Sequence, residues 1–431
     1  MMERGTDVTD MKKKYRTVVE SEYPKVLNLR LFKEEDLRYG ENPNQPAAVY
    51  ALLDDVVDRY DIRLVKSGKG GLGAINLMDV TRGMDILKFF PTPSVAVMKH
   101  NIPSGFATDY NSMYNGSLAE VYVKARDADA RSAFGSVVVF NRPLDQETAD
   151  ELLKTYVEVV AAPDYEEGVV GTLEKKKDLR LVKFDNLNLM PKFVDEDVRD
   201  MYDMKWMPAG RIIVQKPYLS SIKSVDDFIT DPMVIDKDGK KHVVMRDPTP
   251  TEALDMQTAW YVNVGVRSNG IVIVKDGVTR AIGSGQQERV GALENAITKA
   301  YHKAMDREGI KYDPIDGTGI NEDTLNRLRA GIKEYQNAMD KAGIAYVPIE
   351  VIDNTFGMMA RFELKENPLA GAVVSSDAFF PFRDSIDLMA KTGISAVIQP
   401  GGSIKDYEVI DAVNEHNMAM AYTLERCFGH F

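Results

Sequence analysis

Short apolar runs alternate with segments of helical periodicity along most of this 431-residue chain. The runs at 94–98, 137–140 and 396–399 are typical of buried strands, because they are short, almost wholly apolar and bounded by turn-forming residues. The stretches at 118–128 and 146–156 keep apolar residues at helical spacing. This alternation constrains the fold most strongly, and it predicts an α/β protein with a mainly parallel sheet and helices on both faces.

The length of the chain sets the number of domains. It exceeds one ordinary hydrophobic core, so we expect two domains. Residues 1–25 are polar and predict a mobile N-terminal tail. We place the first α/β domain at 26–204 and the second at 205–431. A charge-rich stretch of helix formers at about 305–368 predicts a helical insertion in the second domain.

Composition and charge narrow the classes of function. The formal net charge is −12, from 54 basic and 66 acidic residues, which argues against broad nucleic-acid binding. No run approaches the roughly 18 apolar residues of a membrane span, and the polar N-terminus has no signal-peptide core. The single cysteine, Cys427, excludes an internal disulfide framework and fits a reducing compartment. We therefore expect a cytoplasmic protein without nucleic-acid or membrane partners.

The most informative side chains are Lys99 and His100, which directly follow the strand-like run at 94–98. Pro103 and Gly105 predict that the chain turns just after them. Ligands of open α/β sheets bind outside the carboxyl ends of strands, where an imidazole is well suited to proton transfer near neutral pH. Taken alone, a surface Lys beside a strand-end His is more often structural than catalytic.

Three further loops carry candidate binding groups. A predicted strand at 26–32 leads into loop 36–45, whose Arg, Tyr and amide side chains suit a phosphate as well as a plain turn. The glycines at 68–73 match a dinucleotide-binding pattern, but the acidic residue expected about 20 positions later is missing, which favours a flexible connection. Segment 282–289 opens a helix, where backbone N–H groups favour anions. The helix, strand and loop around it follow the order seen at 81–105, which is typical of a divergent internal duplication.

The sequence contains no metal-binding or serine-nucleophile pattern, so we expect no metal site. No G-x-S-x-G motif occurs, and the histidines stand outside zinc-ligand spacings. These histidines are His100, His242, His302, His416 and His430. The remaining candidates are the Lys99–His100 pair and three arginines in loops, Arg38, Arg289 and Arg426. They indicate a two-domain α/β enzyme that acts on a small anionic molecule.

Six motifs then occur in a fixed order along the chain. They are Leu-Arg-Tyr-Gly-Glu-Asn-Pro at 37–43, Lys-His-Asn-x-Pro-x-Gly at 99–105, Ser-Ala-Phe-Gly at 132–135, Gly-Gln-Gln-x-Arg at 285–289, Ser-Asp-Ala-Phe-Phe-Pro-Phe-Arg-Asp at 376–384 and Gly-Gly-Ser-Ile at 401–404. Together they resemble the AICAR transformylase domain of the bifunctional AICAR transformylase/IMP cyclohydrolase family. In that family a cyclohydrolase domain precedes this one. Only a few tens of residues precede Arg38 here, so we expect a stand-alone transformylase without IMP cyclohydrolase activity.

The resemblance implies a reaction in purine biosynthesis. The formyl group of 10-formyltetrahydrofolate, the co-substrate, moves to the 5-amino group of AICAR, giving FAICAR and tetrahydrofolate. By resemblance, His100 is the base that takes the proton of this weakly nucleophilic amine. Lys99 stabilises charge in the transition state or assists the leaving folate nitrogen. Asn269 orients the formyl group and the amine.

The resemblance also implies two sets of binding residues. Arg38 and Tyr39 contact AICAR at its phosphate, which suits a planar guanidinium, and Glu158 stands where an Asp can occur in the family. The full AICAR set is Arg38, Tyr39, Gly135, Glu158, Arg289 and Arg426. The folate set, which packs the pterin, is Val290, Phe379, Ser403 and Ile404.

The fold implied by the resemblance is a pair of cytidine-deaminase-like three-layer α/β/α subdomains with the helical insertion in the second. The deaminase zinc ligands are absent from this sequence, so the fold does not imply deaminase chemistry. A homodimer with active sites at the interface is expected. Two alternatives stay open: another one-carbon transferase or amidohydrolase on a related aminoimidazole nucleotide, and a non-catalytic purine-nucleotide-binding regulator. The presence of both Lys99 and His100 disfavours the regulator.

Overall fold

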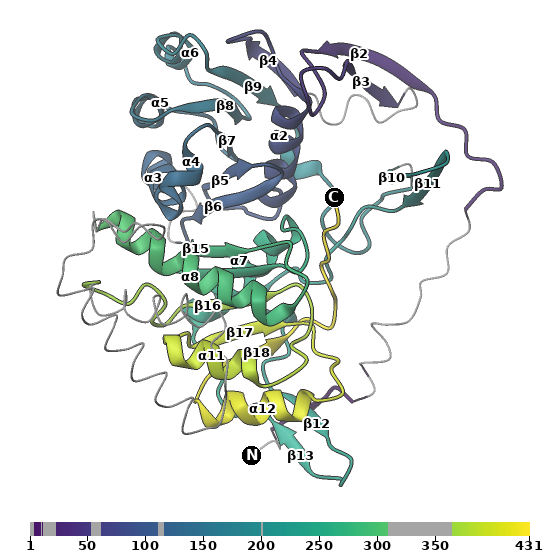
Figure 1. Cartoon of the computed structure of the whole chain (residues 1–431), viewed down its shortest axis with the longest axis vertical. Helices are drawn as coiled ribbons and strands as arrows, with labels where there is room; N and C mark the ends of the chain where they lie inside the picture. The colour runs from purple at the N-terminus through teal and green to yellow at the C-terminus, as the bar shows by residue number, and fades with distance from the viewer. Residues whose placement is uncertain are drawn as a thin grey trace, which may run out of the picture.

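The computed structural model describes residues 4–9, 11, 23–52, 62–110, 116–199, 201–308 and 364–431. The predicted insertion at 305–368 lies mostly outside the described residues, as does much of the predicted N-terminal tail. The described chain is a mixed α/β structure built on an 11-stranded sheet that runs through the length of the molecule (Figure 1).

The strands of this sheet and the helices that cover it are short to medium in length. The strands are β4 (Ile62–Lys66), β5 (Ser94–Lys99), β6 (Ile102–Thr108), β7 (Ser136–Phe140), β8 (Val157–Ala162), β9 (Arg180–Phe184), β14 (Ile271–Lys275), β15 (Val278–Gly283), β16 (Val373–Ser376), β17 (Ala396–Gln399) and β18 (Ala419–Tyr422). The helices are α2 (Ala74–Leu87), α3 (Leu118–Ala128), α4 (Ala130–Ala133), α5 (Gln146–Leu153), α6 (Val169–Leu173), α7 (Pro250–Val264), α8 (Arg289–Arg307), α11 (Asp384–Thr392) and α12 (Asp406–Glu415).

The sheet is mixed, with the strand order β18-β17-β16-β14-β15-β6-β5-β7-β8-β9-β4. Parallel pairing occurs within β7-β8-β9 and β16-β17-β18, whereas β5 is antiparallel to both β6 and β7. The prediction of a mainly parallel sheet is therefore wrong at its centre. The reason is local: β5 and β6 are joined by the two residues His100 and Asn101, and so short a connection can join only antiparallel strands.

Pro103 and Gly105 do not turn the chain, contrary to the prediction. Both lie inside β6, after the turn. Pro103 pairs with Met98 where the register between β5 and β6 shifts, and such an irregularity is one of the few places in a sheet that accept a proline. Gly105 lies so close to α3 that an added Cβ would meet the carbonyl oxygen of Ala125.

The two halves of the sheet repeat one topology. A helix, a hairpin and three further strands follow one another as α2-β5-β6-α3-β7-α5-β8-α6-β9 and again as α7-β14-β15-α8-β16-α11-β17-α12-β18. The halves meet where β6 pairs with β15. The repeat extends to single hydrogen bonds: Asn141 after β7 accepts the N–H of Ser94 at 2.8 Å, and Asp377 after β16 accepts the N–H of Gly270 at 2.9 Å. The repeated order seen in the sequence thus corresponds to a repeated structural unit.

Helices cover both faces of the sheet, as predicted. On one face α2 and α7 share a continuous core that includes Met84 and Trp260. On the other face α3, α5 and α6 pack over the first half around Tyr122, and α8, α11 and α12 pack over the second half around Tyr301. All four side chains are almost fully buried. Burial of this apolar area is the main force that holds the layers together.

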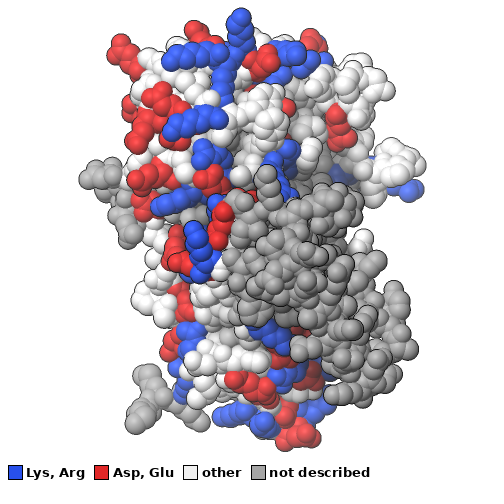
Figure 2. Space-filling model, turned by 60° about the vertical axis from the view of Figure 1, so that its left-hand side comes forward, with Lys and Arg blue, Asp and Glu red and all other residues white. Residues whose placement is uncertain are grey.

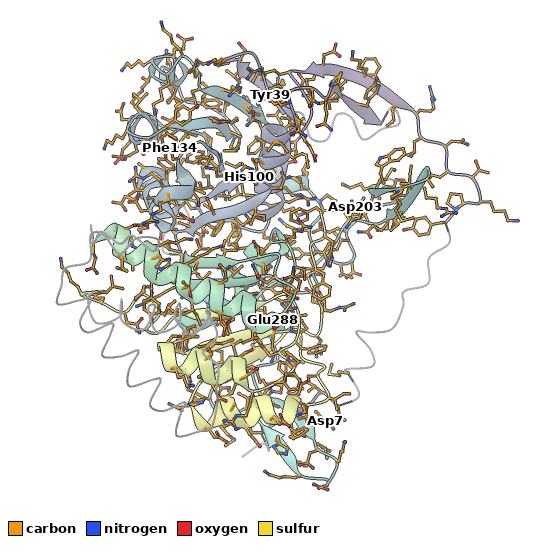
Figure 3. The ribbon with its side chains drawn as sticks, in the orientation of Figure 1. Asp7, Tyr39, His100, Phe134, Asp203 and Glu288 are labelled. Carbon is orange, nitrogen blue, oxygen red and sulfur yellow. The ribbon has the colours of Figure 1, made fainter. Side chains whose placement is uncertain are left out.

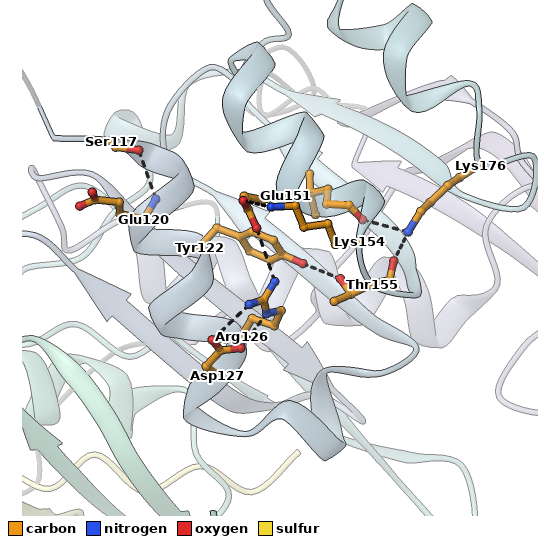
Figure 4. A network of polar contacts seen from close by, with 10 residues as sticks. Ser117, Glu120, Tyr122, Arg126, Asp127, Glu151, Lys154, Thr155 and Lys176 are labelled. Carbon is orange, nitrogen blue, oxygen red and sulfur yellow. Dashed lines mark hydrogen bonds and ion pairs between the residues drawn. The ribbon is translucent and has the colours of Figure 1, made fainter. Parts of the chain in front are cut away.

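A polar network joins the helices of the first half on their outer side (Figure 4). The hydroxyl of Tyr122 on α3 contacts that of Thr155 at 3.0 Å, just beyond α5. Arg126 bonds Asp127 at 2.7 Å and lies 3.8 Å from Glu151 on α5. The network fixes α3 against α5, and α3 leads into α4 and the segment before β7.

Four short strands form two hairpins outside the main sheet. They are β2 (Leu31–Leu37) with β3 (Ala47–Leu52), and β10 (Asp203–Met207) with β11 (Arg211–Gln215). Both hairpins project from the same side of the body (Figure 1). The strand predicted at 26–32 instead begins at Leu31.

Residues 4–9 do not form a mobile tail. β1 (Thr6–Asp7) pairs in parallel with β12 (Pro232–Ile235), which in turn pairs with β13 (Lys241–Val243). Val8 is fully buried, so this segment docks through an apolar contact as well as through backbone bonds.

The described part of the chain contains no helix with the length and hydropathy needed to span a membrane. On the face shown in Figure 2, Lys and Arg side chains alternate with Asp and Glu side chains, and neither sign dominates. Such a surface does not present the basic stripe typical of nucleic-acid binding.

Candidate functional site

All the candidate residues lie at one end of the strands. We call the end at which β5 finishes the His100 end. The strand directions place the starts of β7, β8 and β14 there, together with the ends of β4, β15, β16, β17 and β18. The candidate residues lie at or near these starts and ends, except that Arg38 and Tyr39 follow β2 and pack against the start of α2, although together they span positions 38 to 426 of the sequence. In Figure 3, Tyr39, His100 and Glu288 follow one another down the molecule.

The turn between β5 and β6 presents His100 to solvent. His100 and Asn101 have φ values of 56° and 65°, as a two-residue hairpin of this twist requires. Asn and His both adopt such a conformation more readily than most residues, but the pair lacks the glycine that these turns usually contain. The ammonium of Lys99 donates to the carbonyl of Phe134 at 2.7 Å, and Lys99 lines a cavity together with His100.

Asp79 on α2 holds this turn, and sequence reasoning missed it. The Asn101 N–H donates to Asp79 Oδ1 at 2.6 Å, and the Asp79 side chain is buried. Burial raises the pKa of Asp79 to about 6, although the bond from Asn101 and the nearby His100 act in the opposite direction. The signal in the sequence was a carboxylate among the apolar positions of a predicted helix.

In the second half, too, a buried aspartate on a helix accepts backbone N–H groups of a hairpin turn. Asp255 on α7 accepts the N–H groups of Asp276 and Gly277, at 2.9 and 2.8 Å, in the turn between β14 and β15. Burial likewise raises the pKa of Asp255 above its ordinary value. The counterpart of the His100–Asn101 pair is thus Asp276–Gly277, a pair of residues that hairpin turns ordinarily favour.

Gly135 and Glu158 lie beside the Lys99–His100 turn. The Gly135 N–H donates to the carbonyl of Tyr156 at 2.9 Å, and a Cβ on Gly135 would lie 3.8 Å from Glu158 Oε1. Glu158 is half-buried near the start of β8, and Asn76 on α2 donates to it at 3.4 Å. The carboxylate is therefore oriented by α2 while it stays accessible to a ligand.

Arg38 and Tyr39 pack against the start of α2. The Arg38 N–H donates to the Leu72 carbonyl, and the Ala74 N–H donates to the Tyr39 carbonyl, each at 3.1 Å. The exposed guanidinium of Arg38 lies 5.1 Å from the Tyr39 ring centroid. Within the described ranges it makes no hydrogen bond or ion pair, so its donors can bind an anion.

Asn269 and Arg289 form a bonded cluster with Asp377. The Arg289 guanidinium donates to Asn269 Oδ1 at 2.6 Å and to Ser376 Oγ at 3.2 Å, and it pairs with the fully buried Asp377. Asn269 Nδ2 donates to the Gln286 carbonyl at 3.0 Å. Both ends of the Asn269 amide are therefore fixed. Arg289 orients Asn269, and its charge is neutralised by Asp377.

The C-terminal segment brings Arg426 to the same cluster. The Cys427 N–H donates to the Asp377 carbonyl at 3.2 Å, and the Ser268 N–H donates to the Gly429 carbonyl at 2.9 Å. Arg426 is exposed and lies 4.8 Å from the ring centroid of Phe428. Like Arg38, it has no carboxylate partner among the residues that the structure describes.

The four residues predicted on the folate side surround the ends of β16 and β17. Val290 is the second residue of α8, and Phe379 follows β16. Ser403 Oγ lies 3.4 Å from the Pro381 carbonyl, which joins the loop after β17 to the loop after β16. Ile404 is 84% exposed, so its apolar side chain is free to cover a ligand.

A cavity of about 160 Å³ lies beside the Lys99–His100 turn. Ser284, Lys299 and Lys303 border it, and Lys303 pairs with Asp129 at 3.0 Å. The cavity is cationic because its lining contains three ammonium groups, those of Lys99, Lys299 and Lys303, and one carboxylate, that of Asp129. Its lining does not include Asn269 or Arg289.

Within one chain, the candidates around the end of β5, Lys99 and His100, lie apart from those around β16, which are Asn269, Arg289 and the folate set. Four inter-strand steps separate β5 from β16, which corresponds to roughly 20 Å at the usual spacing between strands. Within the described residues there is also no group of three or more His, Cys, Asp or Glu side chains that could hold a metal.

Comparisons with known proteins agree on one family. The family model described as AICARFT/IMPCHase bienzyme matches residues 7–299. The bifunctional purine biosynthesis protein PurH of Caldicellulosiruptor saccharolyticus is 32% identical over 409 residues, which cover 95% of this chain and 61% of the relative. The PurH of Aquifex aeolicus is 34% identical over 427 residues, with 96% and 65% covered. The chain thus spans less than two thirds of the length of these relatives.

Proposed function

Because the chain belongs to the AICARFT/IMPCHase bienzyme family, we propose that it is an AICAR formyltransferase that uses 10-formyltetrahydrofolate. One observation carries the proposal. Residues from six motifs scattered through the sequence gather at the His100 end of one sheet, where they supply a base candidate, cations and an oriented amide. The products are FAICAR and tetrahydrofolate.

The proposed reaction needs one proton acceptor and one charge stabiliser. The 5-amino nitrogen of AICAR attacks the formyl carbon, and His100 takes the proton of the amine as the C–N bond forms. The bond from the formyl carbon to N10 of the folate then breaks, and N10 receives a proton. Lys99 stabilises the oxyanion or the leaving nitrogen. Asn269, held by Arg289, orients the formyl oxygen and the amine.

The phosphate of AICAR is assigned to Arg38, Tyr39 and Arg426. The support for this assignment is that both guanidinium groups are exposed and have no acidic partner among the described residues. Gly135 and Glu158 are assigned to the rest of the nucleotide, next to His100. Arg289 is assigned an indirect role, since its donors are already bound to Asn269, Ser376 and Asp377.

The pterin of the folate is assigned to Val290, Phe379, Ser403 and Ile404, and a homodimer is proposed to complete the site. A formyl group cannot cross the roughly 20 Å between β5 and β16, so a second copy would bring its Asn269, Arg289, Arg426 and folate set to the Lys99–His100 turn of the first. The exposed apolar side chains of the β10–β11 hairpin are candidates for the contact.

The finer organisation is also a proposal. The repeated topology supports two cytidine-deaminase-like subdomains, at 26–204 and 205–431, joined through β6 and β15. The free, buried thiol of Cys427 is consistent with a cytoplasmic enzyme. Lack of IMP cyclohydrolase activity stays a prediction, which an assay for IMP from FAICAR checks directly.

An absorbance assay for tetrahydrofolate tests the function. With 10-formyltetrahydrofolate and AICAR together, the protein should release tetrahydrofolate and form FAICAR in equal amounts. Release without AICAR would indicate hydrolysis instead of transfer. AICAR binding without any release would favour a nucleotide-binding regulator.

A further inference from the structure

A second cavity lies at the end of the sheet opposite His100. Its volume is about 570 Å³, within the range of about 300–1,000 Å³ typical of small-molecule sites. Asn141 and Arg142 follow β7, Pro163 follows β8 and Asn186 follows β9, so the cavity lies outside the carboxyl ends of three parallel strands. This is the usual position of ligands in open α/β sheets.

By the internal repeat, the loops that line this cavity in the first half correspond to the loops around the cluster of Asn269, Arg289 and Asp377 in the second half. Asn141 stands after β7 as Asp377 stands after β16, and each accepts an N–H from the start of the neighbouring strand. The loops after β16 and β17 carry the residues proposed to bind substrate in the second half. The equivalent loops of the first half line the cavity at the opposite end of the sheet.

The described lining is cationic, although the chain as a whole carries a net charge of −12. Two of its four basic residues have acidic partners: Lys88 pairs with Asp85 at 3.2 Å, and Lys223 lies 3.9 Å from Asp195. The other two, Arg142 and Lys192, have no acidic ion-pair partner among the described residues. No carboxylate belongs to the described lining, so an anion inside the cavity would meet positive charge alone.

Among the described residues, the side chains of Arg142 and Lys192 donate hydrogen bonds only to carbonyl oxygens, and Lys192 Nζ also lies 5.7 Å from the ring centroid of Phe193. Arg142 donates to the Asn141 carbonyl at 3.0 Å and to the Pro91 carbonyl, and Lys192 donates to the Lys88 carbonyl at 3.1 Å. Burial lowers the pKa of Arg142, and no acidic group offsets that effect. Partly buried cations without a counter-ion are costly, which makes an anionic ligand favourable here.

The rest of the cavity suits a flat heterocycle. Phe89 and Phe193 meet edge to face with ring centroids 5.8 Å apart, and Phe193 is only half-buried. Asn186 and Asn188 are exposed, and their side-chain amides make no hydrogen bond within the described ranges. An aromatic face and free amides are the groups that stack on a base and bond its edge.

We propose that this cavity is a second nucleotide site, which binds a nucleoside monophosphate. Arg142 and Lys192 take the phosphate, and Phe193, Asn186 and Asn188 take the base. The site is separate from the proposed formyl-transfer site and does not depend on that function.

Binding of AMP to the full chain, measured by calorimetry in the absence of AICAR, tests the proposal. We expect a saturable AMP site, and we expect the double variant Arg142→Gln/Lys192→Gln to weaken its affinity at least about tenfold, since two charge-assisted contacts are lost. Lys154→Gln, which removes an exposed charge from the end of α5 outside the cavity, is the matched control and should bind AMP as the wild type does. Formyl transfer without AMP should be the same in all three proteins.

A second variant covers the case in which the double variant folds poorly. Asn188→Asp adds a carboxylate to an exposed rim position that makes no side-chain bond within the described ranges, and it should weaken AMP binding by repulsion. AMP affinity that is unchanged in both variants would overturn the proposal. Inorganic phosphate that binds as tightly as AMP would also overturn it, since the base would then contribute nothing. AMP affinity is compared between the wild type and the cavity variants without measuring formyl transfer. The result therefore tests the second site even if the proposed formyl-transfer function is wrong.

Discussion

At the scale of single residues, His100 stands where the backbone would favour another residue. Its positive φ costs an L-residue roughly 1–2 kcal/mol relative to an ordinary conformation. In the equivalent turn of the second half, Asp276 has a similar φ of 54°, and only the second position, Gly277, avoids the cost. Strained positions of this kind are concentrated at functional sites, which is consistent with a catalytic role for His100.

His100→Gly should separate stability from activity. Glycine relieves the strained φ but adds freedom to the unfolded chain, so we expect a change in unfolding free energy between zero and a gain of about 1 kcal/mol. Formyl transfer should be lost. Asp276→Gly in the other hairpin is the control, with similar stability and full activity. A large loss of stability in urea unfolding of His100→Gly would mean that His100 is structural.

Asp79 should make stability depend on pH. Its folded-state pKa of about 6 lies above the ordinary 3.8, so the folded chain keeps a proton that the unfolded chain releases. The stabilisation is complete below about pH 4 and is lost as the pH rises through 6. Asp79→Asn cannot ionise, and its amide oxygen can still accept the Asn101 N–H. Between pH 4 and 7, the unfolding free energy of the wild type should fall relative to the variant by about 2–3 kcal/mol. A difference that does not vary with pH would contradict this.

At the scale of elements, the sequence predicted the bounds of helices and strands where these depend on neighbouring residues. The helix at 118–128 and the strand at 396–399 were predicted with the bounds that the structure has, because apolar periodicity is a local signal. The direction of β5 was not predicted, because it depends on a turn at His100–Asn101 that lacks the usual Asn-Gly signature. Asp79 and Asp377 were missed for a related reason: each acts through a partner 22 or 88 positions away.

Removing the carboxylate of Asp377 should weaken the contact between the end of β16 and the start of α8. Asp377→Asn leaves the buried Arg289 charge without its counter-ion, which ordinarily costs about 3–5 kcal/mol. We expect a large loss of stability in urea unfolding, and a fall in kcat that exceeds any change in AICAR affinity because Asn269 loses its support. Asp387→Asn breaks an exposed pair with Arg383 and should cost far less. Equal effects of the two variants would rule out a special role for Asp377.

At the scale of the whole molecule, the sheet gathers the candidate residues at one end but keeps those of its first half apart from those of its second half. The first half carries the proposed base and cations, and the second carries an oriented amide and an apolar loop pair. No local signal in the sequence reports this separation, since it follows from the order of eleven strands. The second copy of the chain that we propose would bring the two groups of residues together.

The dimer can be tested on the β10–β11 hairpin. Trp206 is 77% exposed and Ile213 is 45% exposed, which is unusual for such side chains on one projecting hairpin. Trp206→Ser/Ile213→Ser should shift the protein from dimer to monomer in sedimentation velocity and abolish formyl transfer while it remains folded. Met245→Ser, at a residue 64% exposed elsewhere, should change neither property. An active monomer would contradict a shared site.

The most direct measurement is AICAR-dependent formyl transfer by His100→Ala, made together with the affinity of the variant for AICAR. If His100 is the base, turnover should fall at least about 100-fold while AICAR affinity changes little, because the phosphate contacts at Arg38 and Arg426 are intact. His416→Ala, which removes an imidazole that contacts Asp387, should keep full turnover. Turnover equal to that of the wild type in His100→Ala would contradict the assignment of His100 as the catalytic base.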